Sequence, residues 1–339
     1  MHTFWVGVGQ VQSEPYQKNE IDAQLSGTPF LYQPSQDCPE SLSRLADRLP
    51  PLKIAFVRAI GKNVMETARD ALDQGLAIPT LVGEVKTIIS DAEAIGWNLD
   101  GVRLINSVGE REAIDTSISL VNSGEVLGLI KGQIHSDVFM GGIVRRDAGI
   151  RSDSRMIHVF AMLPPNGGRA LLISDAAVNV NPSVETRVDS ALQMAEMARK
   201  LGVVRPKIAV LSATESLSNA IPSSAEAEQI AQLARKVDKE ADYAGPLSLD
   251  LAISPRSVIS KGIAKDSLLG IVAGKADALV VPDIVSGNLL FKSLVYFAGG
   301  LAAGIVVGGK VPIILTSRSD PPQARLASIA LAALTNSKY

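Results

Sequence analysis

The chain has 339 residues, of which 46% are hydrophobic and only 4% aromatic, and its formal net charge is -2. This charge gives no basic surface for nucleic acid, and no apolar run reaches the ~20 residues that span a bilayer. The single cysteine, Cys38, excludes an internal disulfide framework and a cysteine metal cluster. Without a basic start or apolar core typical of a secretory signal, we expect a cytoplasmic protein with no nucleic-acid or membrane partner.

The length predicts two domains, and a core of Ala, Val, Ile and Leu is typical of parallel sheets covered by helices. Residues 1–45 are polar and irregular, and we interpret them as an N-terminal arm outside the core. A strand at 53–57, a helix at 63–74 and a strand at 78–82 follow. This β-α-β rhythm predicts a parallel sheet with right-handed crossovers.

Further along the chain, a strand at 125–130 ends at Lys131. Residues 156–163 and 170–173, joined by a Pro- and Gly-rich turn, predict an antiparallel hairpin. A helix at 183–201, a strand at 208–211 and a helix at 224–237 are predicted next. A strand at 276–281 is followed by a helix that ends at 297. Two more strands, at 302–309 and 312–317, precede a last helix at 321–334.

Polar residues follow the last of these strands. The guanidinium of Arg318 offers a planar fork for a phosphate or carboxylate, and Ser317 adds a hydroxyl donor. The helix expected from Pro321 presents free N–H groups, which favour an anion. Asp320 fits either a general base or an N-cap, and Arg318 fits either an anion site or an ordinary surface position.

A second polar segment, Ser286-Gly287-Asn288, lies between a strand and a helix. Ligands of open α/β sheets bind beyond the carboxyl ends of strands, so we expect this segment and Arg318 to form one small-anion site. Glycine at such a turn lets the backbone approach a ligand closely. The alternative is an ordinary helix start capped by Ser286 or Asn288.

Lys131 and Gly132 follow another strand end, with His135 close behind. His135 fits a proton carrier, although a lone histidine is more often a packing or capping residue. Arginines also gather around the expected domain boundary, where they suit either an anion in a cleft or a solvated face. These arginines are Arg145, Arg146, Arg151, Arg155 and Arg169.

Motifs of several large enzyme classes are absent from the sequence, including G-x-x-x-x-G-K-[ST], H-E-x-x-H and G-x-S-x-G. Other segments resemble the phosphate acetyl/butyryl transferases, and the butyryl branch most closely. The resemblance covers roughly residues 50 to 337. The segments that carry it are 129–132 (LIKG), 149–151 (GIR), 174–182 (SDAAVNVNP), 245–250 (GPLSLD), 281–297 (VPDIVSGNLLFKSLVYF) and 303–320 (AGIVVGGKVPIILTSRSD).

This resemblance implies an α/β fold like that of isocitrate and isopropylmalate dehydrogenases, with two domains around a cleft. The first domain is expected over 46–154 and 311–339, and the inserted second domain over 155–310. The resemblance also implies a homodimer that transfers a short acyl group between coenzyme A and inorganic phosphate. Acyl-CoA and phosphate are then the partners, with no metal and no tightly bound cofactor.

The family's Ser-Arg pair matches Ser317 and Arg318, which implies a phosphate site. Its catalytic aspartate matches Asp320 in the butyryl branch, whereas the position used by acetyl members is Ala324. Gly141 stands where many members have an arginine. We therefore expect Asp320, Ser317 and Arg318 to be catalytic. The expected substrate-binding residues are Lys131, Gly132, His135, Arg151, Ser286, Gly287 and Asn288. Two alternatives remain: an NAD-dependent dehydrogenase on this fold, and a non-catalytic relative that binds acyl-CoA or phosphate.

Overall fold

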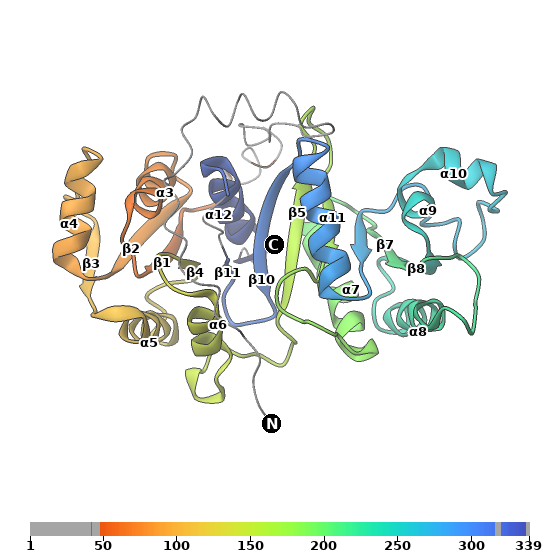
Figure 1. Ribbon diagram of the computed structural model, residues 1–339, viewed down its shortest axis with the longest axis horizontal. Coiled ribbons are helices and arrows are strands. Elements are labelled where there is room, and N and C mark those ends of the chain that lie inside the picture. The colour runs from red at the N-terminus through yellow and green to blue at the C-terminus, as the bar shows by residue number, and fades with distance from the viewer. Residues whose placement is uncertain (1–41, 43–47, 316–319, 337–339) are drawn as a thin grey trace, which may run out of the picture.

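The computed structural model describes residues 42, 48–315 and 320–336 (Figure 1). These residues form helices around one large sheet, which confirms the α/β class. The strands are β1 (Leu52–Val57), β2 (Ala77–Gly83), β3 (Arg103–Asn106), β4 (Leu129–Lys131), β5 (Ile157–Leu163), β6 (Leu171–Ser174), β7 (Lys207–Leu211), β8 (Asp242–Leu247), β9 (Ala278–Val280), β10 (Leu301–Val307) and β11 (Ile313–Ile314). Their order in the sheet is β3-β2-β1-β4-β11-β10-β5-β6-β9-β7-β8.

Helices cover this sheet along its whole length, from α4 beside β3 at one end to α8, α9 and α10 beside β8 at the other (Figure 1). The helices are α3 (Lys62–Asp73), α4 (Val85–Ala94), α5 (Gly109–Asn122), α6 (Ser136–Val144), the 3-10 turn η1 (Arg146–Ala148), α7 (Val184–Lys200), α8 (Pro222–Val237), α9 (Leu249–Ile253), α10 (Pro255–Ser260), α11 (Ile284–Tyr296) and α12 (Pro322–Asn336).

The predicted hairpin is confirmed, because β5 pairs antiparallel with β6. β10 also pairs antiparallel, with β5 on one side and β11 on the other. The other neighbouring strands run parallel. It follows that β9 and β11 run in opposite directions.

In the sheet, the strands of each expected domain lie next to one another. β1 to β4 and β11 occupy one half, and β5 to β10 occupy the other. The antiparallel contact between β10 and β11 joins the halves into one continuous sheet. β11, from the first expected domain, and β7, from the second, therefore belong to the same sheet. The division into two domains stays a prediction.

Several element ends differ from the sequence-based expectations. β4 starts only at Leu129, because the backbone N–H groups of Glu125 and Val126 donate to the Leu120 carbonyl at the end of α5. The N-cap of α3 is Gly61 and not Asn63. By contrast, Ser183 caps α7 as its sequence suggests, by accepting a hydrogen bond from the Thr186 N–H.

The side chains of the central strand β5 alternate between two apolar clusters. Val159 and Ala161 belong to the cluster that contains α7 and α12, whereas Met162 packs in the cluster that contains residues of α11. α11 crosses one face of the sheet in front of β5 (Figure 1). Residues 324–334 of α12 are all buried, and this helix packs on β10 and contacts α3 and α7. The start of α12 is thereby fixed at the centre of the molecule.

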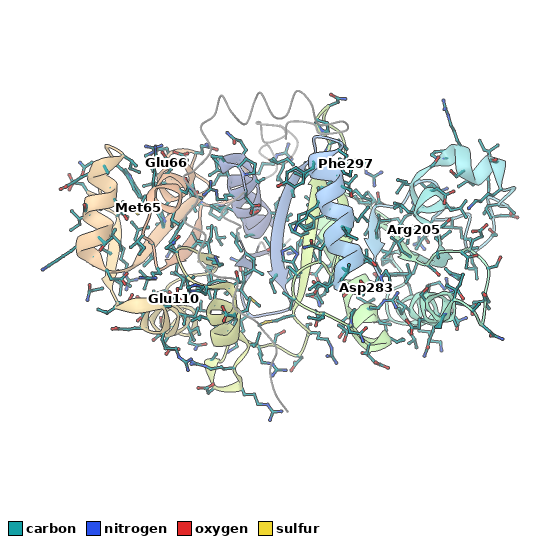
Figure 2. The ribbon with its side chains drawn as sticks, in the orientation of Figure 1. Met65, Glu66, Glu110, Arg205, Asp283 and Phe297 are labelled. Atoms are coloured by element: carbon teal, nitrogen blue, oxygen red, sulfur yellow. The ribbon has the colours of Figure 1, made fainter. Side chains whose placement is uncertain are left out.

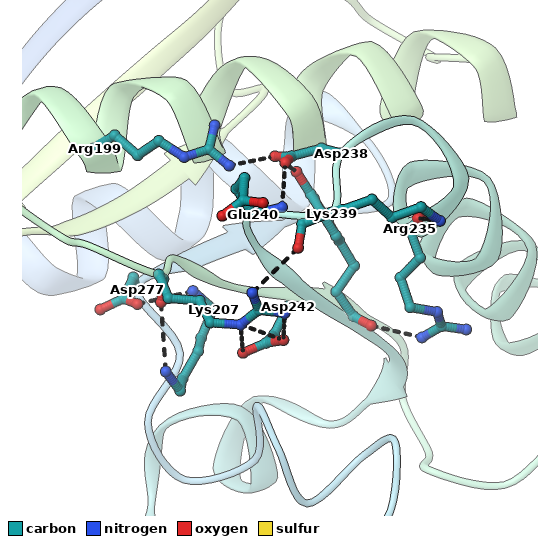
Figure 3. A network of polar contacts seen from close by, with 10 residues as sticks. Arg199, Lys207, Arg235, Asp238, Lys239, Glu240, Asp242 and Asp277 are labelled. Atoms are coloured by element: carbon teal, nitrogen blue, oxygen red, sulfur yellow. Dashed lines mark hydrogen bonds and ion pairs between the residues drawn. The ribbon is translucent and has the colours of Figure 1, made fainter.

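A network of polar contacts connects the elements around β7 and β8, at one end of the sheet (Figure 3). Asp238 accepts hydrogen bonds from Arg199 at 2.6 Å and from the Tyr243 hydroxyl at 2.7 Å. Burial and the hydrogen bond to Asp238 raise the pKa of Tyr243. Arg205 forms a two-pronged ion pair with Asp242. These contacts join α7, the C-cap of α8, the segment before β7, and β8. None of these residues lines the cavity described next.

Candidate active site

A cavity of about 730 Å³ lies at the centre of the sheet, between the β4–α6 loop, α11 and the start of α12. Four predicted site residues line it together: Lys131, His135, Asn288 and Asp320. They come from three separate parts of the sequence, and the fold brings them to one place. Other lining residues include Ser136, His158, Phe160, Phe291, Ala302, Gly304, Leu315, Ala324 and Ser328.

Gly132 brings the chain after β4 close to the end of β1. A Cβ atom at this position would lie 2.4 Å from the Arg58 carbonyl oxygen and 2.6 Å from that of Val57. The Gly132 N–H donates to the Val57 carbonyl at 3.0 Å. The glycine is thus required for close packing of the two strand ends, and this packing orients Lys131 and His135.

His135 is joined to a small charged cluster at the carboxyl ends of β1 and β2. Its Nδ1 lies 2.7 Å from Oε1 of Glu110, in the first turn of α5 (Figure 2). Arg58 lies between Glu110 and Glu84, with its guanidinium 3.6 Å and 3.2 Å from the two carboxylates. Burial alone would raise the pKa of Glu84, but hydrogen bonds from backbone N–H groups and from Arg58 lower it overall.

Two residues of the segment at the start of α11 have structural contacts. Asp283 is the N-cap of α11 (Figure 2). Its carboxylate accepts from the N–H of Ser286 at 2.9 Å and from the Ser286 hydroxyl at 3.0 Å. A Cβ atom at Gly287 would lie 2.5 Å from the Asp175 carbonyl oxygen, so this glycine allows helix packing. Asn288 alone of the three lines the cavity.

Asp320 lies between β11 and α12. Ser317 and Arg318, predicted to bind the anion, lie outside the described residues. The buried Arg325 is on the first turns of α12 and donates to the Asn63 carbonyl at 3.2 Å. Burial lowers the pKa of Arg325, whereas the charges of Asp320 and Glu66 oppose this shift.

The arginines near the expected domain boundary do not line this cavity. Arg145 pairs with Asp115 at 2.7 Å, and Arg155 lies 3.6 Å from Asp189. Arg169 pairs with Asp277. Arg151 is exposed and forms an isolated antiparallel bridge with Gly309. Its role in substrate binding stays a prediction. Gly141 is exposed on α6, and a Cβ atom there would meet no other atom within 4 Å.

The cavity residues that sequence reasoning missed include His158 and Phe160 on β5, and Phe291 on α11. The only signal for His158 was one polar side chain inside an apolar strand. Among the residues that the structure describes, no group of three or more His, Cys, Asp or Glu side chains could hold a metal ion. In the same part of the chain, no helix combines the length and apolar character needed to cross a membrane.

Comparisons with known proteins agree with the resemblance. The family described as phosphate acetyl/butaryl transferase matches residues 110–333. The phosphate acetyltransferase of Rickettsia felis is 36% identical over 85% of this chain and 81% of its own length. The phosphate butyryltransferase of Clostridium acetobutylicum is 32% identical over 83% of this chain and 92% of its own. The structure of a branched-chain phosphotransacylase from Enterococcus faecalis superposes with a TM-score of 0.75, at 28% identity, over 85% of this chain and 100% of that one. The chain therefore belongs to the phosphate acetyl/butyryl transferase family.

Proposed function

We propose that the protein is an acyltransferase that moves a short acyl group, acetyl or butyryl, reversibly between coenzyme A and inorganic phosphate. The observation that carries this proposal is the cavity in which Lys131, Asn288 and Asp320 meet in a chain of this family. Family membership does not favour the dehydrogenase alternative. Coenzyme A is a substrate here, and no tightly bound cofactor is part of the proposal.

The reaction requires each group to act at a defined atom. In the direction of acyl-CoA synthesis, Asp320 accepts the thiol proton of coenzyme A. The sulfur attacks the acyl carbon, a C–S bond forms, and the bond from that carbon to the phosphate oxygen breaks. Negative charge develops on the carbonyl oxygen and on the leaving phosphate. Ser317, Arg318 and Lys131 stabilise the phosphate charge through fixed donors.

The remaining predicted residues hold the substrates in place. Asn288 and His135 line the same cavity and bind substrate there. Gly132, Ser286 and Gly287 act indirectly, because their contacts set the backbone that carries Lys131 and Asn288. Arg151 stays a predicted substrate-binding residue, although it does not line this cavity.

The proposal extends to assembly and location. The two halves of the sheet correspond to two α/β domains around a cleft, as in isocitrate and isopropylmalate dehydrogenases, and the enzyme acts as a cytoplasmic homodimer. The sheet order supports the two-domain part, because strands of the inserted segment lie together at one side. Sedimentation of the purified chain, which should give twice the 35.7 kDa chain mass, tests the dimer.

The activity is tested with a panel of acetyl-, butyryl- and longer acyl-CoA substrates and the purified full chain. We expect thiol release that requires phosphate, and acyl-CoA formation when acyl phosphate and coenzyme A are supplied instead. Thiol release that does not depend on phosphate would indicate a thioesterase and contradict the proposal. The absence of release from every member of the panel would contradict it as well.

A further inference from the structure

The imidazole of His158 has an unusual position on β5. The residue is only 1% exposed, yet it lines the cavity, and its Nδ1 has no hydrogen-bond partner among the described residues. The neighbouring acid, Asp175, accepts from the His158 backbone N–H at 3.0 Å and not from the ring. Its oxygens also accept from the N–H groups of Ala177 and Val178 and from the side chain of Asn179. Asp175 therefore fixes the backbone of β5 and leaves Nδ1 of the imidazole without a partner among the described residues.

An unpaired polar group inside a protein is costly, and native structures contain few of them. Burial lowers the pKa of His158 to about 4, although the charge of Asp175 opposes the shift. The ring is consequently neutral near pH 7. A neutral imidazole still has one N–H donor and one acceptor nitrogen. His158 thus places an uncharged ring that can form hydrogen bonds on the wall of the cavity.

Two phenyl rings continue from His158 along the cavity wall. The centroids of His158 and Phe160 are 4.3 Å apart with an interplanar angle of 60°, and those of Phe160 and Phe291 are 4.0 Å apart with an angle of 26°. Gly304 on β10 makes room for them, because a Cβ atom there would lie 2.7 Å from Phe160 and 3.1 Å from His158. Asn288, three residues before Phe291 on α11, also lines the cavity.

We propose that His158, Phe160 and Phe291 form the acyl subsite: the two phenyl rings contact the hydrocarbon chain, and the imidazole N–H donates a hydrogen bond to the acyl carbonyl oxygen. This inference rests on the proposed transferase function. Both acyl-CoA and acyl phosphate contain that carbonyl, so the same contact serves both directions of the reaction. Negative charge develops on the carbonyl oxygen as the acyl group is attacked, and a fixed donor in a buried site stabilises it.

The donor is tested with His158→Phe, which keeps an aromatic ring without an N–H, and with His158→Gln, which keeps a donor. We expect His158→Phe to lower kcat/KM for butyryl-CoA by about 10²-fold, the effect of losing one such donor. His158→Gln should lose less, and free coenzyme A, which has no acyl group, should bind all forms equally. In infrared difference spectra of butyryl-CoA, the carbonyl band should shift on binding to wild type and not to His158→Phe.

Ser174→Ala is the matched control. The Ser174 hydroxyl is also buried and unpaired, but it does not line the cavity, so kinetics should not change. If the wild-type enzyme is active and His158→Phe retains both its kcat/KM and the band shift, the subsite is wrong and the transferase function stands. Equal losses in both histidine variants, together with weaker binding of free coenzyme A, would show a purely structural role. An inactive wild-type chain would instead contradict the proposed function.

The apolar part of the subsite is tested by Phe291→Ala. Removing this ring makes room for a longer chain, so the ratio of kcat/KM for hexanoyl-CoA to that for acetyl-CoA should rise at least about tenfold, the lower end of the effect of one methylene. Phe297→Ala is the control, because Phe297 follows α11, is 54% exposed and does not line the cavity (Figure 2). An unchanged ratio in Phe291→Ala would contradict the contact with the acyl chain.

Discussion

His135 and Glu110 form a hydrogen-bonded pair at the edge of the cavity, with Nδ1 of the imidazole 2.7 Å from Oε1 of the carboxylate. The same oxygen accepts from the His135 backbone N–H at 3.2 Å. Nη1 of Arg58 lies 3.6 Å from this oxygen. A carboxylate only accepts hydrogen bonds, so in the neutral imidazole Nδ1 holds the proton and Nε2 is the free acceptor. Glu110 is thus a positioning residue for His135.

We predict that Glu110→Ala raises the KM for phosphate about tenfold and changes kcat less than about twofold. The reason is that one charge-assisted hydrogen bond, worth roughly 1.5–3 kcal/mol, no longer orients His135. Steady-state kinetics with varied phosphate measures the effect. Glu112→Ala is the control, because Glu112 is also in the first turn of α5 but bonds the Val108 N–H. Equal effects of the two variants would point to lost charge at the helix start instead.

We predict that Asp320, and not His135, is the thiol base. Asp320 lines the cavity and lies two residues after Arg318 in the sequence, at the position that matches the catalytic aspartate of the butyryl branch. Asp320→Asn should keep coenzyme A binding and lower kcat by about 10² to 10⁴, the range for general-base catalysis. Single-turnover thiol consumption and titration calorimetry measure the two effects. If His135→Ala loses turnover and Asp320→Asn does not, the two roles are reversed.

The phosphate site is predicted from sequence alone. Arg318→Ala should raise the KM for phosphate and lower kcat by about 10² or more, the cost of losing one donor to developing charge. Arg318→Lys keeps the charge without the planar fork, so it should recover only part of the loss. Initial rates over a range of phosphate concentrations measure both. Wild-type kinetics in Arg318→Ala would remove this residue from the site.

Local signals made many elements predictable from the sequence. The helix expected at 183–201 is α7, Val184–Lys200, because Ser183 provides a cap and apolar residues recur at helical spacing. The turn between β5 and β6 likewise marks their hairpin. The apolar run at 302–309 contains no such signal for direction. Whether β10 runs parallel or antiparallel to its neighbours depends on the path of the whole chain.

Part of the cavity lining was predictable from polar residues that follow strands, because Lys131, His135, Asn288 and Asp320 meet in one cavity. His158 was missed because it lies inside an apolar strand. Its proposed role depends on Asp175, which accepts a hydrogen bond from the His158 backbone N–H and leaves Nδ1 of the ring without a partner. Gly287 was expected at a ligand, but it packs against the Asp175 carbonyl. Sequence spacing does not distinguish close approach to a ligand from close approach to another part of the chain.

Two adjacent glycines on α6 provide a matched pair for stability. No atom lies within 4 Å of a Cβ atom at the exposed Gly141, whereas a Cβ atom at Gly142 would lie 2.8 Å from Ile114. Gly141→Ala should therefore raise the free energy of unfolding by about 0.5–1 kcal/mol through higher helix propensity. Gly142→Ala should lower it by about 1–3 kcal/mol through overpacking. Chemical denaturation of both variants measures this, and equal shifts would contradict the packing seen at Ile114.

Glu84 should make the stability of the protein depend on pH in the acidic range. Its Oε1 accepts from Arg58 Nη2 at 3.2 Å and from the Gly109 N–H at 3.0 Å. Burial tends to raise the pKa of this carboxyl, but these hydrogen bonds, together with one from its own backbone, lower it below the ordinary value of 4.5. The folded protein thus binds this proton less tightly than the unfolded chain. The stabilisation from Glu84 is fully present above about pH 4.5 and is lost as the pH falls through the folded-state pKa.

Compared with wild type, Glu84→Gln should melt at a lower temperature at about pH 6, and the difference should shrink towards about pH 3. Glu93→Gln, at an exposed position on α4, should show no such trend in thermal melts. A difference between wild type and Glu84→Gln that stays constant over this range would contradict the lowered pKa of Glu84.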